Sequence, residues 1–285
     1  LCHATFYSTK KPTEIKELWL KNSYRRDLIE YIPGLNKEDL EAINDTEGMN
    51  RFISMETDFC TAVNNWNGAA SISKGDILFA IADDLLPTKG WDKKLRELLI
   101  NLNPRKYHFA IKINDSNSNF DTKMRHPIIS RRFYEEFGLF DNKFRGVFCD
   151  DDITNTAFWK SLIIDGREIK INHNNGELNK SNNFKIPIST ININKKSEYE
   201  YGFKIIQGKW SYKRLIAKKI LFKKKPNFFS DKIYFNLTKF VRILSLILLF
   251  LNFKEVFAAI YKKLGKLKLL SFKKKSIEKN EKKKR

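Results

Sequence analysis

A short run of uninterrupted apolar residues, Ile77 to Ala82, ends at two aspartates, Asp83 and Asp84. Such a run suits a strand that is covered on both faces, as strands of parallel sheets are. Parallel strands need long crossover connections, which are usually helices. From residue 1 to about 175, segments with helical spacing of apolar residues do alternate with short apolar runs. The sequence therefore predicts an α/β fold with a mostly parallel sheet flanked by helices.

The expected elements follow from apolar runs, helical periodicity and turn residues. Strands are predicted at 2–6, 28–32, 77–82, 107–113 and 162–171. Helices are predicted at 13–22, 61–73, 91–101, 131–137 and 152–161. Turn-forming residues predict a turn at 87–90 and a loop at 114–119.

The positive charge of the chain is concentrated toward its end. Lys and Arg number 54 and Asp and Glu 33 among 285 residues, a formal net charge of +21. Residues 201–285 hold 25 of the cations and 4 of the acids, which leaves 29 of each in residues 1–200. We therefore predict a folded domain at 1–180, a basic connecting segment at 181–235 and a separate basic segment at 236–285.

The last segment has the character of a helix that lies on a membrane. Its apolar stretch, Ile243 to Phe253, is shorter than the roughly 20 residues needed to span a bilayer. Cations such as Arg242 and Lys254 flank it, which predicts an amphipathic helix in the membrane interface, followed by a Lys-rich tail. Each cation near an anionic leaflet contributes about 1 kcal/mol. The alternative is a helix packed on the domain with a solvated tail.

Three cysteines, Cys2, Cys60 and Cys149, are an odd number without the spacing of a metal site. This pattern favours a reducing compartment over a disulfide framework. The first residue is Leu1, and no secretory signal pattern opens the sequence. The expected location is cytoplasmic, peripheral on the inner face of the cell membrane.

Asp83 and Asp84 stand where ligands of open α/β sheets bind, beyond the carboxyl end of a strand. Adjacent carboxylates repel each other unless a cation compensates, and Mg²⁺ or Mn²⁺ often joins one or two carboxylates to substrate phosphates. The pair therefore predicts a divalent-cation site. The alternative is an ordinary turn or helix cap.

A second acidic cluster, Asp150 to Asp152, follows Val147 to Cys149, which we expect at another sheet edge. One of its carboxylates is a candidate general base toward a hydroxyl, and a second could orient that hydroxyl. The alternative is a helix N-cap. His173, after the strand predicted at 162–171, is a candidate metal ligand, although a lone His is usually structural.

The order and spacing of several motifs resemble nucleotide-sugar glycosyltransferases of family 2, which have the GT-A fold. The resemblance covers residues 1–175 and is carried by His3-Ala4-Thr5, Lys11-Pro12, Trp19, Asn64 to Ala70, Ser73 to Leu78, Ala82-Asp83-Asp84, Pro87, Trp91-Asp92, Pro127 to Ser130, Arg132 to Tyr134, Gly138, Asp150 to Asp152, Thr154 and His173. It implies that residues 1–180 are a GT-A glycosyltransferase catalytic domain.

The resemblance also implies roles for individual residues. Asp84 corresponds to the main metal-contacting carboxylate and His173 to a further metal ligand. Thr5, Asn67 and Asp83 correspond to donor-binding positions, with Thr5 beside the base. The family's catalytic base falls on Asp150 and its second acid on Asp152.

Two departures from the family pattern concern the donor. Ala82 stands where the family has the first acid of its Asp-x-Asp motif. Gly34-Leu35-Asn36 replaces the acidic pattern after the second strand, which makes Asn36 or Asp39 the candidates for base recognition.

The resemblance implies a metal-assisted, inverting transfer of a sugar from a nucleotide-diphosphate sugar, expected to be a UDP-sugar. The acceptor is expected to be a hydroxyl of a cell-surface glycan or a glycolipid. Mn²⁺ or Mg²⁺ is the expected cofactor, because a divalent ion stabilises the charge on the departing diphosphate. Asp150 would accept the proton of the attacking hydroxyl.

Two other function classes compete with this interpretation. A sugar nucleotidyltransferase would carry a Gly-rich basic phosphate loop near its start, and residues 1–20 contain no Gly. A non-enzymatic basic protein that binds nucleic acid or an anionic membrane is suggested by the pI of about 9.7. The equal numbers of cations and acids in residues 1–200 argue against a nucleic-acid groove on the domain.

Overall fold

The computed structural model describes residues 1–5, 10–55, 62–115, 123–160, 162–173 and 195–221. Contacts divide the chain into two units, Leu1–Lys239 and Phe240–Arg285. The amphipathic helix and Lys-rich tail predicted at 236–285 lie outside the described residues.

The first unit is built on one eight-stranded sheet with the strand order β3-β2-β1-β4-β7-β6-β8-β5. Strands β1, β2, β3 and β4 pair in parallel, as do β6 and β8, whereas β7 and β5 are antiparallel to their neighbours. The strands are β1 (Cys2–Ala4), β2 (Ile32–Asn36), β3 (Phe52–Ser54), β4 (Ile77–Ile81), β5 (Leu85–Pro87), β6 (Phe109–Asn114), β7 (Ile128–Ser130) and β8 (Leu162–His173).

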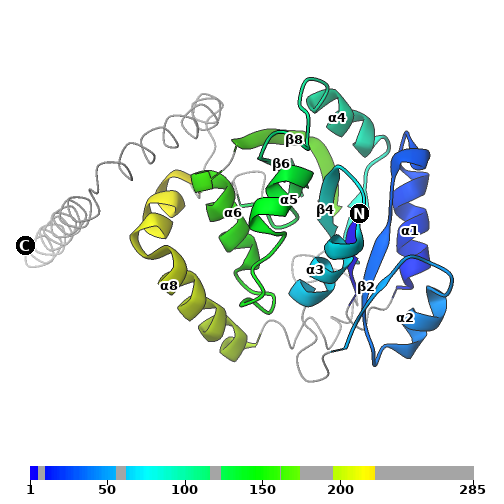
Figure 1. Cartoon of the computed structure of the whole chain (residues 1–285), viewed down its shortest axis with the longest axis horizontal. Coiled ribbons are helices and arrows are strands. Elements are labelled where there is room, and N and C mark those ends of the chain that lie inside the picture. Colours follow the sequence, from blue (N-terminus) through cyan, green and yellow to red (C-terminus); the bar gives the residue numbers. More distant parts are fainter. Residues whose placement is uncertain (6–9, 56–61, 116–122, 161, 174–194, 222–285) are drawn as a thin grey trace, which may run out of the picture. The chain divides into compact units, whose positions relative to one another are not determined.

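Helices lie on both sides of the sheet (Figure 1). They are α1 (Pro12–Lys21), α2 (Leu40–Asp45), α3 (Ala62–Ile72), α4 (Trp91–Leu98), α5 (Arg131–Phe137), α6 (Cys149–Lys160) and α8 (Lys196–Leu221), with a 3-10 turn at Arg26–Leu28. A mixed, mostly parallel sheet between helices confirms the predicted α/β fold.

The core between α1, α4 and the sheet is anchored by three aromatic rings. Trp19 packs edge-on against Phe79 at 5.3 Å and against Trp91 at 5.1 Å between ring centroids. All three side chains are buried, so they remove large apolar areas from water. This packing fixes β4, and with it the position of the two aspartates that follow.

The second strand lies later in the chain than predicted. The residues expected as a strand at 28–32 begin with the 3-10 turn, which is held by Asp92 through the amides of Tyr24 and Arg25 at 2.6 and 2.8 Å. The strand itself is Ile32–Asn36 and contains Pro33 and Gly34. A Cβ on Gly34 would lie 2.2 Å from the backbone oxygen of Asn65, so close packing of α3 on β2 requires glycine.

Two other segments differ from the expectations. Val147 and Phe148 are not in a strand, and Cys149 begins α6, so the acidic cluster occupies the first turn of a helix and does not follow a sheet edge. The segment expected to connect the domain to the tail contains α8, which contacts α6 within the first unit. Among the described residues, no helix combines the length and apolar character needed to cross a bilayer.

Candidate active site

The strand directions bring four chemically active segments to one edge of the sheet. β1 and β4 are parallel, so the ends of both strands, near Thr5 and Asp83, point the same way. β7 is antiparallel to β4, which places its start, preceded by His126, at that same edge. His173, the last residue of β8, pairs with Leu85 just after the two aspartates. This edge is where ligands of open α/β sheets bind.

Asp83 is tied to the first strand. Its Oδ1 lies 2.6 Å from Nε2 of His3, which is fully buried, and its backbone oxygen accepts from Lys10 Nζ at 3.1 Å. The other ring nitrogen of His3 contacts the hydroxyl of Tyr31, which donates to the backbone oxygen of Pro12 at 2.9 Å. Burial raises the pKa of Tyr31, so this hydroxyl stays neutral.

Asp84 is paired with His173. His173 Nε2 lies 2.9 Å from Oδ2 of Asp84, across 89 positions of sequence. Burial by itself would raise the pKa of Asp84, but the hydrogen bond and charge of His173 outweigh it and leave that pKa below its usual value. Oδ1 of Asp84 is buried without a hydrogen-bond partner. The carboxylate is thus ionised, with one oxygen left to bind something else.

His126 links the two acidic stretches. Its ring lies edge-on to that of His173, at 5.2 Å between centroids. Burial, followed by the charge of His173, lowers the pKa of His126 to about 4, while Asp84, Asp115 and Asp150 act in the opposite direction. These three carboxylates come from the segments after β4 and β6 and from α6, and each raises the pKa of His126.

The neutral state of buried His126 predicts an acid-sensitive fold. Its pKa is about 4 in the folded protein, against 6.5 for a solvated histidine, so the unfolded chain binds the extra proton between these values. The free energy of unfolding should fall by about 2 kcal/mol from pH 7 to pH 5 because of this residue. Urea unfolding at both pH values, with a chelator present, measures the change. The His126→Asn variant should show a smaller pH dependence; equal slopes would contradict the assignment.

Asp150 shares a lysine with its neighbour. Lys123 Nζ lies 2.7 Å from Oδ2 of Asp150 and 2.8 Å from Oδ2 of Asp151. Burial would lower the pKa of Lys123, but the two carboxylates raise it overall. Lys123 therefore stays charged beside Asp150, the candidate general base.

Asp152 faces away from Lys123, toward α8. Its Oδ1 accepts from Trp210 Nε1 at 2.6 Å and its Oδ2 from Lys209 Nζ at 2.9 Å. The side chain is only 5% exposed, and burial raises its pKa despite these two bonds. The contacts favour a structural role for Asp152, so its role as a second catalytic acid stays a prediction.

Thr5 and Asn36 lie in a buried polar cluster at the ends of β1 and β2. Asn65 Nδ2 donates to the backbone oxygen of Thr5 at 2.8 Å and to Oδ1 of Asn36 at 2.9 Å. This leaves Nδ2 of Asn36 and Oδ1 of Asn65 without hydrogen-bond partners. Both atoms are buried, so a base could pair with them only after this cluster opened. The other candidate, Asp39, accepts from the amide of Ala42 and caps α2.

Asn67 is engaged within the protein. Its Nδ2 donates to the backbone oxygen of Phe140 at 2.8 Å, and its Oδ1 accepts from the Phe140 amide at 3.0 Å. These bonds join α3 to the segment before α6. The donor-binding role of Asn67 therefore stays a prediction, and the side chain has no spare hydrogen-bonding group beyond its contact with Asn142.

A divalent ion fits the Asp84–His173 pair. Adjacent ligands of a six-coordinate ion at about 2.1 Å lie about 3 Å apart, which is the separation of these two side-chain atoms. The partnerless Oδ1 of Asp84 also suits a cation. Among the described residues, no group of three or more His, Cys, Asp or Glu side chains could hold a metal. Mg²⁺ commonly takes one or two protein ligands and completes its shell with water and phosphate oxygens.

Sequence reasoning missed the partners of these acids. His3 entered only through the family resemblance, and neither His126 nor Lys123 was a candidate. Isolated residues of this kind have no local pattern, and only the strand order brings them to the acids.

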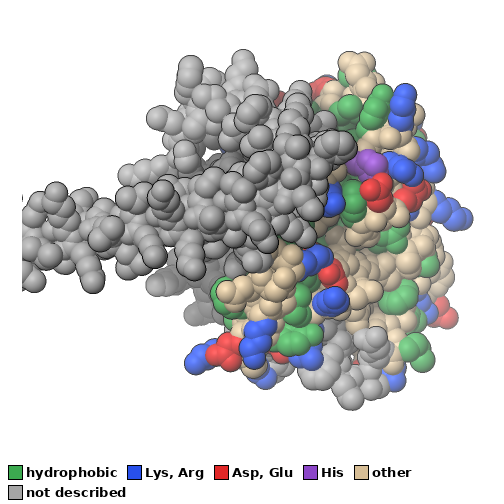
Figure 2. Space-filling model, turned by 60° about the vertical axis from the view of Figure 1, so that its left-hand side comes forward, with side chains coloured by type: hydrophobic (Ala, Val, Ile, Leu, Met, Phe, Trp, Pro, Cys, Tyr) green, Lys and Arg blue, Asp and Glu red, His purple; other side chains and the backbone are tan. Residues whose placement is uncertain are grey.

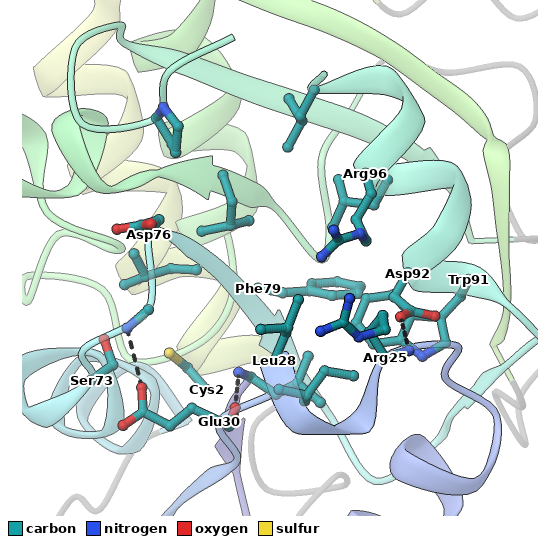
Figure 3. Close-up of a pocket in the computed structure, with 18 of the residues that line it drawn as sticks. Cys2, Arg25, Leu28, Glu30, Ser73, Asp76, Phe79, Trp91, Asp92 and Arg96 are labelled. Carbon is teal, nitrogen blue, oxygen red and sulfur yellow. Dashed lines mark hydrogen bonds between the residues drawn. The ribbon is translucent and has the colours of Figure 1, made fainter. Parts of the chain in front are cut away.

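The described part of the chain also contains two cavities. One of about 650 Å³ is lined by β3, α3 and the segment before α6, and includes Asn67 and Tyr201. The other, of about 630 Å³, lies at the opposite edge of the sheet, at the starts of β1 and β4. Figure 3 shows this second cavity, with Cys2, Glu30, Ser73 and Asp76 on one side and Arg25, Trp91 and Arg96 on the other. None of the predicted site residues lines it.

Comparison with known proteins gives a distant likeness in structure. No protein-family model matches the sequence, and no curated protein matches it. Among solved structures, the chain is similar to S. aureus TarS, with a TM-score of 0.45 and 14% sequence identity. The likeness covers 59% of this chain and 35% of the TarS chain, so this chain corresponds to about a third of that protein.

Proposed function

We propose that the protein transfers a sugar from a nucleotide-diphosphate sugar, a UDP-sugar in the first instance, to a hydroxyl of a cell-surface glycan or lipid-linked acceptor. The observation that carries this proposal is the pair of differently partnered carboxylates around His126. Asp84 is bound to a histidine and keeps one free oxygen, whereas Asp150 is bound to a lysine. The surroundings of Asp84 suit the binding of a cation, and those of Asp150 suit a general base.

On the donor side, Asp84 and His173 would hold Mn²⁺ or Mg²⁺. When bound, the ion supplies positive charge that stabilises the diphosphate leaving group. Asp83 is held between His3 and Lys10, a fixed position from which it could accept hydrogen bonds from sugar or ribose hydroxyls. The spare amide groups of Asn36 and Asn65 would bind the base.

On the acceptor side, Asp150 would take the proton of the attacking hydroxyl. Its carboxylate is bound by Lys123 and is 19% exposed, so part of it can reach a substrate. Attack from the face opposite the diphosphate inverts the anomeric carbon and needs no protein nucleophile. His126, neutral at physiological pH, adds no charge that would compete with the donor's cation.

A nucleic-acid-binding function has less support. In the view of Figure 2, the Lys and Arg side chains of the described part lie among acidic and apolar side chains and form no continuous basic strip. A groove for a phosphate backbone needs such a strip.

A donor screen tests the proposed function. The full chain should bind one class of UDP-, GDP- or dTDP-sugar only with Mn²⁺ or Mg²⁺ present, and should slowly hydrolyse it. Isothermal titration with and without EDTA measures binding, and release of nucleoside diphosphate measures turnover. Failure to bind any of these donors in the presence of metal would contradict the proposal.

We further propose that the basic C-terminal segment holds the protein on the inner face of the cell membrane. Its 15 cations among residues 236–285 should favour anionic lipid. The full chain should sediment with vesicles that contain phosphatidylglycerol and be released by about 0.5 M salt, because screening weakens such contacts. Equal binding to neutral phosphatidylcholine vesicles would contradict an electrostatic attachment.

A further inference from the structure

We propose that α8 positions Asp150 by contacting residues that lie before it and after it in the sequence. The inference rests on the proposed role of Asp150 as general base. α8 lies in sequence far beyond the α/β domain, yet it runs alongside α6, whose first turn carries Asp150 (Figure 1).

The residue before α6 has an unusual backbone. Phe148 has a φ of 69°, and it is the one non-glycine residue with positive φ in the part of the chain that the structure describes. Bulky side chains rarely adopt this conformation, which persists only where surrounding contacts impose it. Phe148 lies two residues before the candidate base, so the contacts that impose its strained conformation also bear on Asp150.

The first part of α8 supplies contacts to Phe148. Its ring lies 6.0 Å from that of Tyr199 and 6.1 Å from that of Phe203, between centroids. Gly202 lies between these two residues and is buried. A Cβ on Gly202 would lie 2.8 Å from the backbone oxygen of Val147 and 3.0 Å from Cδ2 of Phe148. Only glycine lets the helix approach this closely.

The next turns of α8 contact Asp152, which follows Asp150 by two positions. Trp210 and Lys209 donate to the two carboxylate oxygens of Asp152, as described above. Lys209 also lies 2.7 Å from Oδ2 of Asp141, before the strained residue. Residues 202, 209 and 210 of α8 therefore contact residues both before and after Asp150 in the sequence.

This arrangement separates the two halves of the site. The contacts of Asp83 and Asp84 in the described part of the chain are with His3, Lys10 and His173, none of which lies in α8, so loosening α8 should leave donor binding intact. The carboxylate of Asp150 would lose its fixed direction, and misplacement of a base by about 1 Å can slow a reaction about 100-fold. Gly202, Lys209 and Trp210 are therefore positioning residues for the transfer step.

A matched pair of glycine variants tests this inference. Gly202→Ala forces α8 away from Val147, whereas Gly208→Ala, in the same helix, meets no atom within 4 Å. Both changes favour the helix equally by intrinsic propensity. Gly202→Ala should lower kcat at least about tenfold with the donor Kd unchanged, and Gly208→Ala should keep both values.

Hydrogen exchange gives a readout that does not depend on sugar transfer. The amides of residues 148–153 should exchange at least about tenfold faster in Gly202→Ala than in Gly208→Ala. Trp210→Phe, which removes one hydrogen bond and keeps a ring, should show the same change if Gly202→Ala does not fold. Unchanged exchange and kcat would overturn the inference, whereas faster exchange in a protein that transfers no sugar would overturn only the proposed function.

Discussion

Asp84→Asn is expected to abolish sugar transfer and to remove the metal dependence of donor binding. The amide cannot supply a second anionic oxygen, so the pair with His173 loses the charge that attracts a divalent ion. Loss of a group that stabilises transition-state charge commonly costs about 100- to 1,000-fold in kcat. Product formation by chromatography measures transfer, and titration with and without Mn²⁺ measures donor binding.

Asp76→Asn is a suitable control for this variant. Asp76 also lies beside β4, but before its first residue, where it forms an exposed ion pair with Arg105 at 2.6 Å. Such pairs contribute little to stability, so this variant should behave as the natural protein. Metal-dependent donor binding that persists in Asp84→Asn would show that the ion binds elsewhere.

Asp150→Asn is expected to block transfer while donor binding stays unchanged. An amide cannot accept the proton of the acceptor hydroxyl, and general-base catalysis contributes about 100- to 10,000-fold. Asp151→Asn is the matched control, because Asp151 binds the same Lys123 nitrogen at nearly the same distance. The control should lose far less kcat than Asp150→Asn. Retained turnover in both Asp84→Asn and Asp150→Asn would remove the basis of the whole site.

The parts of the fold that sequence predicts best have strong local patterns. The apolar run of β4 is a strand at Ile77–Ile81, and α5 spans the predicted residues 131–137. β2 was misplaced because its sequence contains Pro33 and Gly34, which normally disfavour strands. The glycine is explained by a neighbour distant in sequence, since Gly34 lies against the backbone of α3. Such tertiary requirements leave no trace in a local window.

The candidate site shows the same division. Asp84, His173 and Asp150 were predicted as site residues, and their roles stay predictions; the structure shows that Asp84 contacts His173 and that Asp150 contacts Lys123. Asn67 and Asp152 were identified in the same way, but their polar atoms are bound by Phe140 and by α8. Residue type and order predict which side chains are capable of chemistry. Residue type and order cannot predict which of these side chains form hydrogen bonds within the folded protein.

The hydrogen bonds from α8 to Asp152 bear on where the functional unit ends. A shortened protein that stops at residue 180 would match the boundary suggested by charge, but it would lack Trp210 and Lys209. Asp152 would then lose both donors, and a hydrogen bond to a charged group contributes about 1.5–3 kcal/mol to stability. The smallest piece of this chain worth purifying for enzymology therefore extends through the last turn of α8, to residue 221.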